Sequence, residues 1–177
     1  MSRIIPLIVG AVLFCFSAVS YALPDHLPLS KDLTVRLSAL SAQGELQTVA
    51  EVVARTDALG KIAFDFPTVP SSATTPFLHI RIMDGENVLR QAIVPSPQPG
   101  GTVDAGVSEV TDLQARALLK ATALSGRLTP VHMLVAHTLL RTPTISTTDA
   151  EAIGSAIVAG ADALFAVLAT DGLSSDQ

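Results

Sequence analysis

The spacing of the apolar residues changes near residue 108, and this change limits the fold more than any other feature of the chain. Before it, short runs with an apolar residue at every second position recur, as at Leu33, Val35 and Leu37. After it, apolar residues follow the three-to-four spacing of an amphipathic helix. We therefore predict an α+β protein, with an antiparallel β-sandwich of six or seven strands in a domain over residues 23–107 and a helical domain over 108–177.

Turn residues separate the predicted strands. These strands are a first run around residues 33–37 and the segments 46–55, 61–66, 77–84, 88–95 and 102–107. The tetrad Asp84-Gly85-Glu86-Asn87 predicts a hairpin, because Gly and Asn tolerate positive φ. Alternation along two of the strands gives the first predicted core residues: Ile62, Phe64 and Phe66 on one face, and Leu78, Ile80 and Ile82 on another.

Three helices are predicted beyond residue 110. The pair Thr111 and Gln114 has the pattern of a capping box for the first helix, which Gly126 ends. Thr129 followed by Pro130 is typical of a helix start, and predicts a second helix that ends by residue 141 because Pro143 follows.

The third predicted helix begins at a second capping box, Thr148 with Glu151, and runs to about residue 170. Its apolar stripe consists of Ile153, Ile157, Ala161, Leu164, Phe165 and Leu168, and a second face carries the small residues Ala159, Ala163 and Ala166. A membrane span is an alternative for this helix, but Asp162 in its middle disfavours insertion.

The second predicted helix is apolar on opposite sides. Val131, Leu134, Val135 and Leu139 form one face, while Met133, Ala136 and Leu140 form the other. A helix that is apolar nearly all round either lies inside a core or is covered by a partner. We take Met133, Ala136 and Leu140 as a candidate interaction face for a protein partner or a second copy of the chain.

The N-terminus has the pattern of a secretory signal peptide. The cation Arg3 precedes an apolar run over residues 4–19, and the small residues Ser20 and Ala22 suit cleavage after Ala22. Residues 1–22 are thus expected to be removed on export to the periplasm or the exterior, which leaves no membrane attachment; an uncleaved N-terminal anchor is the alternative. Cys15 lies within this segment, so the mature chain has no disulfide.

The stretch Thr56-Asp57-Ala58-Leu59-Gly60-Lys61-Ile62-Ala63-Phe64 resembles the turn-and-strand signature of carboxypeptidase-regulatory-like domains, which are transthyretin-type β-sandwiches. Asp57 begins the turn, Gly60 takes its strained position, and alternate apolar residues then enter the core. The resemblance covers about residues 30–107 and is carried by Thr56, Asp57, Gly60 and Phe64. It implies an accessory or adhesive module; residues 108–177 are assigned to no family.

The polar residues suggest no catalytic, cofactor or metal site. His132 and His137 are five residues apart and point in different directions on a helix, so we interpret them as ordinary surface or boundary residues. His79, Arg81 and Arg90 form a candidate cationic patch, although a solvated outer face of the sheet is the favoured interpretation.

An acidic chain with 11 Lys and Arg against 16 Asp and Glu offers little cationic surface for nucleic acid, so no such partner is expected. The sequence thus predicts an exported, non-enzymatic interaction or structural module of the bacterial cell envelope. The alternatives are a carrier of a small apolar ligand between the helices and the sheet and, less favoured, an enzyme of unknown class.

Overall fold

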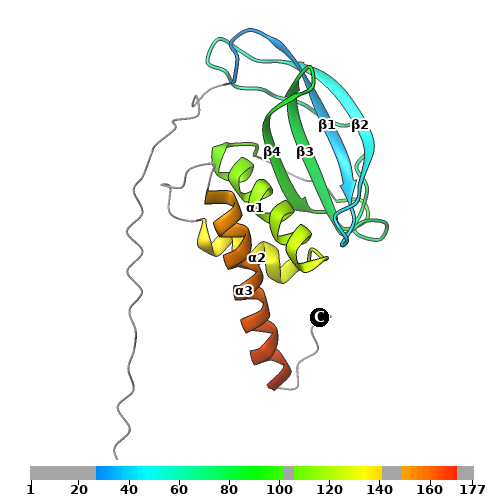
Figure 1. Ribbon diagram of the computed structural model, residues 1–177. Helices are drawn as coiled ribbons and strands as arrows, with labels where there is room; N and C mark the ends of the chain where they lie inside the picture. The colour runs from blue at the N-terminus through cyan, green and yellow to red at the C-terminus, as the bar shows by residue number, and fades with distance from the viewer. Residues whose placement is uncertain (1–26, 102–105, 141–148, 171–177) are drawn as a thin grey trace, which may run out of the picture.

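The computed structural model describes residues 27–101, 106–140 and 149–170. Along the chain, the elements are β1 (Asp32–Leu40), β2 (Leu46–Arg55), β3 (Phe77–Asp84), β4 (Asn87–Pro95), α1 (Glu109–Ser125), α2 (Pro130–Leu139) and α3 (Asp149–Thr170). The four strands form one antiparallel sheet in the order β2-β1-β3-β4, followed by the three helices (Figure 1). The α+β class and its order of strands before helices are as predicted.

The sheet has fewer strands than the six or seven that we predicted, and the described residues contain no second sheet. Residues 61–66, predicted as a strand, contribute only one bridge, between Ile62 and Thr56. Their alternating burial is nevertheless present, with Ile62, Phe64 and Phe66 half-buried between exposed neighbours. An apolar residue at every second position indicates an extended chain with one covered face. It does not require hydrogen bonding to a neighbouring strand. Of the segment 102–107, only residues 106 and 107 are described, and they lie in no strand.

One face of the sheet forms the first part of the core. Its buried side chains are Leu33, Val35 and Leu37 from β1 and Leu78, Ile80 and Ile82 from β3, as alternation predicted for the second group. Ile62, Phe64, Phe66 and Val69 from the loop between β2 and β3 pack over them. This loop takes the position that a second sheet occupies in a sandwich.

The opposite face of the sheet packs against the helices. Leu40, Phe77 and Ile93 lie in one cluster with side chains from all three helices and with Leu140, which directly follows α2. The helix residues of this cluster include Ala115, Leu118, Ala121, Ala136, Ile153 and Ile157. Figure 1 shows α1 lying along the sheet on the side of β4, with α2 and α3 beyond it. This cluster therefore joins the two halves of the chain into one core.

The predicted helix ends are mostly correct. Gly126 caps α1 with φ 73°, and Thr129 caps α2 with Pro130 at the first position. The first capping box is displaced by three residues, because Ser108 is the N-cap of α1 and Thr111 completes the box instead of starting it. Thr148, the predicted cap of the third helix, lies outside the described residues.

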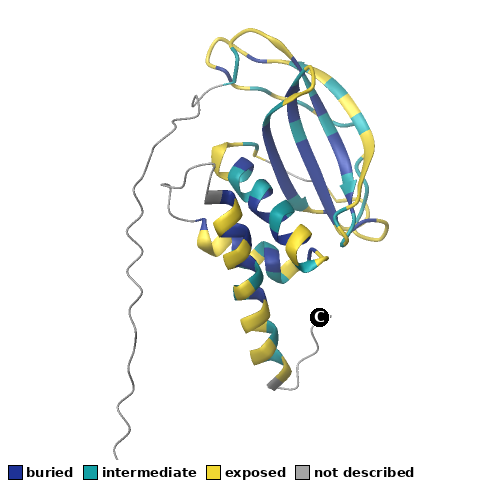
Figure 2. Ribbon diagram, viewed as in Figure 1, coloured by how far each residue is buried: buried dark blue, intermediate teal, exposed yellow. Residues whose placement is uncertain are grey.

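The two halves of α3 differ in burial. Ile153, Ile157 and Ala161 are buried in the first half, whereas Leu164 in the second half is exposed. Figure 2 shows the last turns of α3 extending past the other helices with mostly exposed residues. The predicted apolar stripe is therefore a core stripe only up to Ala161. The small residues Ala159, Ala163 and Ala166 are exposed.

Candidate functional site

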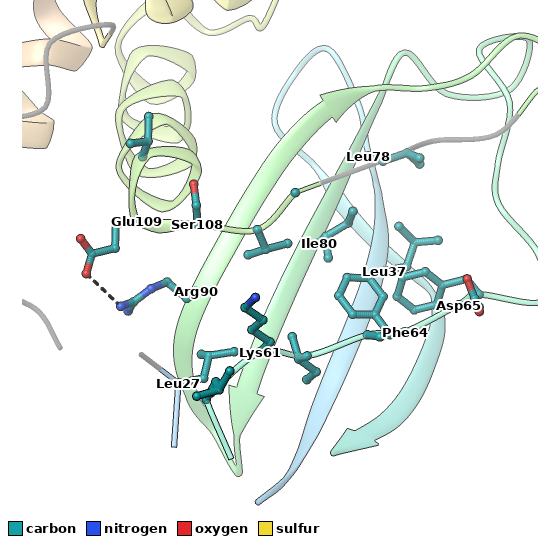
Figure 3. A pocket seen from close by; sticks show the side chains of 18 of the residues that line it. Leu27, Leu37, Lys61, Phe64, Asp65, Leu78, Ile80, Arg90, Ser108 and Glu109 are labelled. Carbon is teal, nitrogen blue, oxygen red and sulfur yellow. Dashed lines mark hydrogen bonds and ion pairs between the residues drawn. The ribbon is translucent and has the colours of Figure 1, made fainter. Parts of the chain in front are cut away.

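A groove of about 1420 Å³ lies on the sheet face opposite α1 (Figure 3). Leu37, Leu78 and Ile80 form its floor. One wall is the covering segment, which we define as residues 58–69, and the other is the stretch 106–110 that leads into α1. A largely apolar hollow with a few polar groups is the usual form of a small-molecule site.

The turn that begins the covering segment is built as the signature residues predicted. The carboxylate of Asp57 accepts hydrogen bonds from the backbone N–H groups of Leu59 and Lys61, each at 2.8 Å. Gly60 has φ 73°, a backbone angle that residues with a side chain rarely adopt. These backbone N–H groups, that of Lys61 first, hold the pKa of Asp57 below its usual value of 3.8. The turn thus fixes where the covering segment begins.

Thr56 anchors the same turn to the start of β1. Its hydroxyl accepts a hydrogen bond from the backbone N–H of Lys31 and donates one to the carbonyl of Pro28. Thr56 is buried, so the hydroxyl satisfies backbone groups that water does not reach. Phe64, the last residue of the signature, packs edge to face on Phe66 with ring centres 5.6 Å apart.

Side-chain packing alone holds the later part of the covering segment. From Phe64 to Pro70, no hydrogen bond joins this segment to any other part of the described chain. Segments with few hydrogen bonds and partly exposed side chains open at low free-energy cost. The wall of the groove is therefore its most easily displaced part.

The groove carries two cations in its lining. Arg90 lies 3.2 Å from the carboxylate of Glu109 at the start of α1, and its side chain is 9% exposed. Lys61 is exposed and forms no ion pair with any described residue. Figure 3 shows Lys61 extending between Arg90 and Phe64.

The predicted cationic patch of His79, Arg81 and Arg90 is not formed. A register shift in the β3–β4 hairpin leaves Leu89 without a partner, so that Arg90 lies opposite Ile82. Arg90 therefore shares the groove face of the sheet, whereas His79 and Arg81 lie on the face toward α1. Regular pairing would have placed Arg90 opposite Arg81, on the face that carries His79.

The face that carries His79 is not the solvated surface that we expected. His79 is 2% exposed, and its Nε2 lies 2.8 Å from the amide oxygen of Gln91. Burial lowers the pKa of His79 to about 4, more than the hydrogen bond to Gln91 raises it. This histidine is a neutral structural group, with its Nδ1 left without a partner among the described residues.

The two histidines of α2 have different surroundings. His132 is buried, with Nδ1 at 2.6 Å from the hydroxyl of Thr129, and its ring packs edge to face against Phe165. Burial, followed by the nearby charge of Arg127, lowers the pKa of His132. His137 is exposed. His132 was thus missed as a core residue, and the two side chains do not meet at one site.

The candidate interaction face of α2 requires a correction. Ala136 is fully buried, Leu140 is 6% exposed, and Met133 packs against the same core. These residues face α1 and α3 and are not open to a partner. The exposed large apolar residues of these two helices are others: Leu134 at 57% and Leu139 at 41% on α2, with Leu164 at 38% and Val167 at 56% on α3.

Among the described residues, one helical stretch is long and apolar enough to cross a membrane. It is Ala150–Ala169 in α3, with a mean hydropathy of 2.0. The buried core helix of a water-soluble protein meets the same criteria of length and composition. Ala22, the predicted cleavage site, and Cys15 lie outside the described residues.

No protein-family model matches the chain, and no curated protein or solved structure matches it. The resemblance to carboxypeptidase-regulatory-like domains therefore stays a prediction. The alternation of apolar residues predicted the floor of the groove and Phe64 in its wall, and the turn signature predicted the roles of Asp57 and Gly60. Arg90 was missed at this site because nothing in the sequence marks the displacement at Leu89.

Proposed function

We propose that this chain is an exported, non-enzymatic interaction or structural module of the bacterial cell envelope. The observation that supports it best is the apolar surface of two neighbouring helices, where Leu134, Leu139 and Leu164 are 57%, 41% and 38% exposed. Large exposed apolar side chains that gather on one region are typical of binding surfaces. The signal-peptide pattern of residues 1–22 supports export, and the turn signature supports an accessory role.

Export is tested on the chain from Met1 to Gln177, expressed in a bacterial host and purified from the envelope fraction. N-terminal sequencing and intact mass are then measured. A chain that begins at Leu23 without added mass supports cleavage after Ala22 and release into the periplasm. A mass that begins at Met1 favours the uncleaved anchor instead.

The interaction surface is tested by Leu134→Ser together with Leu164→Ser. Both residues are exposed, so the folded state should be retained, and circular dichroism checks this. Leu124→Ser is the matched control, because Leu124 on α1 is 54% exposed but lies outside the α2–α3 surface. We expect chemical cross-links to a specific envelope protein, or to a second copy, to disappear in the double variant and to persist in the control. Cross-links that persist in both would contradict the proposal.

A second candidate function is the carriage of a small apolar ligand. The groove supports it, although not at the position first predicted, because the space between the helices and the sheet is filled by buried side chains. Native mass spectrometry after gentle purification should show an added mass on the folded chain. If no preparation carries one and no apolar probe binds, this function is excluded.

A further inference from the structure

We propose that the groove binds a single-chain anionic amphiphile, such as a long-chain carboxylate. The apolar chain lies over Leu78 and Ile80, and the anionic head lies at Lys61. This inference rests on the second candidate function and gives its ligand a chemical class. It is independent of the α2–α3 surface, since the groove lies on the sheet face opposite α1.

The lining of the groove suits a hydrocarbon chain. Besides the floor, the apolar side chains that surround the groove are Leu27, Ile62, Phe64, Phe66, Val69 and Val107. The floor comes from two adjacent strands, with Leu37 on β1 beside Leu78 and Ile80 on β3. A floor of this width is suited to one chain laid along the strands. Burial of each methylene on such a surface contributes to binding by the hydrophobic effect.

The chain gains access by displacing the covering segment. Leu78 and Ile80 are only 1% and 3% exposed, so Phe64 and Phe66 must move outward before a ligand reaches them. No hydrogen bond opposes this movement between Phe64 and Pro70 within the described chain. The apolar contacts that the two rings lose are replaced by contacts with the ligand, which therefore favours the open state.

The charges of the groove select the head group. Arg90 and Glu109 neutralise each other, and Lys61 forms no ion pair with a described residue. Lys61 interacts electrostatically with Asp57, but that carboxylate is occupied by two backbone N–H groups. Asp65 is about 13 Å further along an extended chain, and Figure 3 shows it on the far side of Phe64. An anion therefore finds a positive charge at this end of the groove.

The test compares three ten-carbon probes on the purified chain by isothermal titration calorimetry: decanoate, decanol and decyltrimethylammonium. We expect one decanoate to bind per chain, and decyltrimethylammonium to bind at least several-fold more weakly. Lys61→Met should weaken decanoate binding roughly two- to fivefold and leave decanol binding unchanged. Lys120→Met is the matched control, because Lys120 pairs with Glu151 away from the groove.

A second variant tests the location without touching the charge. Gly106 lines the groove, and a Cβ there meets no atom of the described residues within 4 Å, so Gly106→Phe should place a ring in the groove with little strain. We expect it to abolish binding of decanoate and decanol alike, with an unchanged thermal midpoint. Full decanoate affinity in Gly106→Phe would overturn the location.

The remaining outcomes separate the inference from the function on which it rests. Equal affinity for all three probes overturns the assignment of the head group but leaves an apolar carrier. Failure of decanoate and decanol alike overturns the inference and the carrier function together. Extraction of phosphatidylglycerol from vesicles by a chain that does not bind decanoate overturns the single-chain ligand in favour of a two-chain lipid.

Discussion

The imidazole of His79 on β3 donates from Nε2 to the amide oxygen of Gln91 on β4, at 2.8 Å, in the layer between the sheet and α1. Both side chains are nearly inaccessible to water, with 2% and 8% of their surface exposed. The ring is neutral in this setting, since burial lowers its pKa to about 4. A hydrogen-bonded polar pair is thus buried in the layer between the sheet and α1.

Acid should destabilise the protein through His79. The folded state keeps this ring neutral down to about pH 4, whereas the unfolded chain protonates it near pH 6.5. The contribution of the neutral ring is therefore complete above pH 6.5 and is lost as the pH falls toward 4. The free energy of unfolding should decrease by about 3 kcal/mol across this window. Urea unfolding at a series of pH values measures the decrease.

The variant His79→Gln isolates this effect, because glutamine keeps an amide donor and does not titrate. Its unfolding free energy should change less steeply between pH 6.5 and 4 than that of the native chain. His137→Gln, which replaces an exposed histidine, should retain the native slope. An unchanged slope in His79→Gln would show that another group carries the acid sensitivity.

Local patterns in the sequence predicted local structure well, and pairing between segments less well. Gly126, the Thr129-Pro130 start of α2 and the hairpin at Gly85 were correct, because each depends on a few neighbouring residues. The segment around Phe64 has the alternation of a strand, but its only backbone pairing in the described chain is the bridge at Ile62. Alternation indicates that one face of a segment is covered, and it does not show that the backbone pairs with a neighbouring strand. That distinction accounts for the missing second sheet.

The candidate sites failed for a related reason. One extra residue at Leu89 moves Arg90 to the other face of the sheet, and no sequence signal marks it. Both faces of α2 are apolar, so its sequence alone does not determine which face is buried in the core. The structure buries the face of Ala136 because α1 and α3 both pack against it. Such choices depend on tertiary contacts that a single helix pattern does not contain.

Removal of the Asp57 carboxylate should loosen the turn that begins the covering segment. Asp57→Ala loses both hydrogen bonds from the N–H groups of Leu59 and Lys61, whereas Asp57→Asn retains an oxygen acceptor. We expect the thermal midpoint to fall in the order native, Asn, Ala. Amide exchange of Leu59 and Lys61, whose N–H groups donate to this carboxylate, should accelerate in the same order.

The same carboxylate predicts a second acid effect, at lower pH than that of His79. Its folded pKa lies below the ordinary 3.8, so its contribution to stability is present above that value and is lost as the pH falls through the folded pKa. Asp57→Asn should remove this part of the acid transition and leave the part above pH 4 intact. Identical acid curves for the native chain and the variant would contradict the assignment.

Replacement of the N-cap of α1 should distinguish the observed capping box from the one first predicted. The hydroxyl of Ser108 accepts a hydrogen bond from the backbone N–H of Thr111, and the hydroxyl of Thr111 accepts one from the backbone N–H of Ser108 at 2.8 Å. Ser108→Ala should therefore cost about 1 kcal/mol of stability. Gln114→Ala, at the position that the sequence pattern suggested, should cost much less. Urea unfolding of the two variants decides between them, and a larger loss in Gln114→Ala would reverse the assignment.

Close approach of α3 to α2 depends on Gly160, and a double-mutant cycle should show it. A Cβ added at Gly160 would lie 2.9 Å from Cγ1 of Val135, which is too near for two carbon atoms. Gly160→Ala should therefore destabilise the native chain by about 1–2 kcal/mol, the cost of overpacking less the better helix propensity of alanine. Val135→Ala removes the opposing methyl groups, so in that background Gly160→Ala should be neutral or stabilising by up to about 1 kcal/mol. If Gly160→Ala changes the free energy of unfolding equally in both backgrounds, a contact other than the one with Val135 limits the size of the residue at position 160.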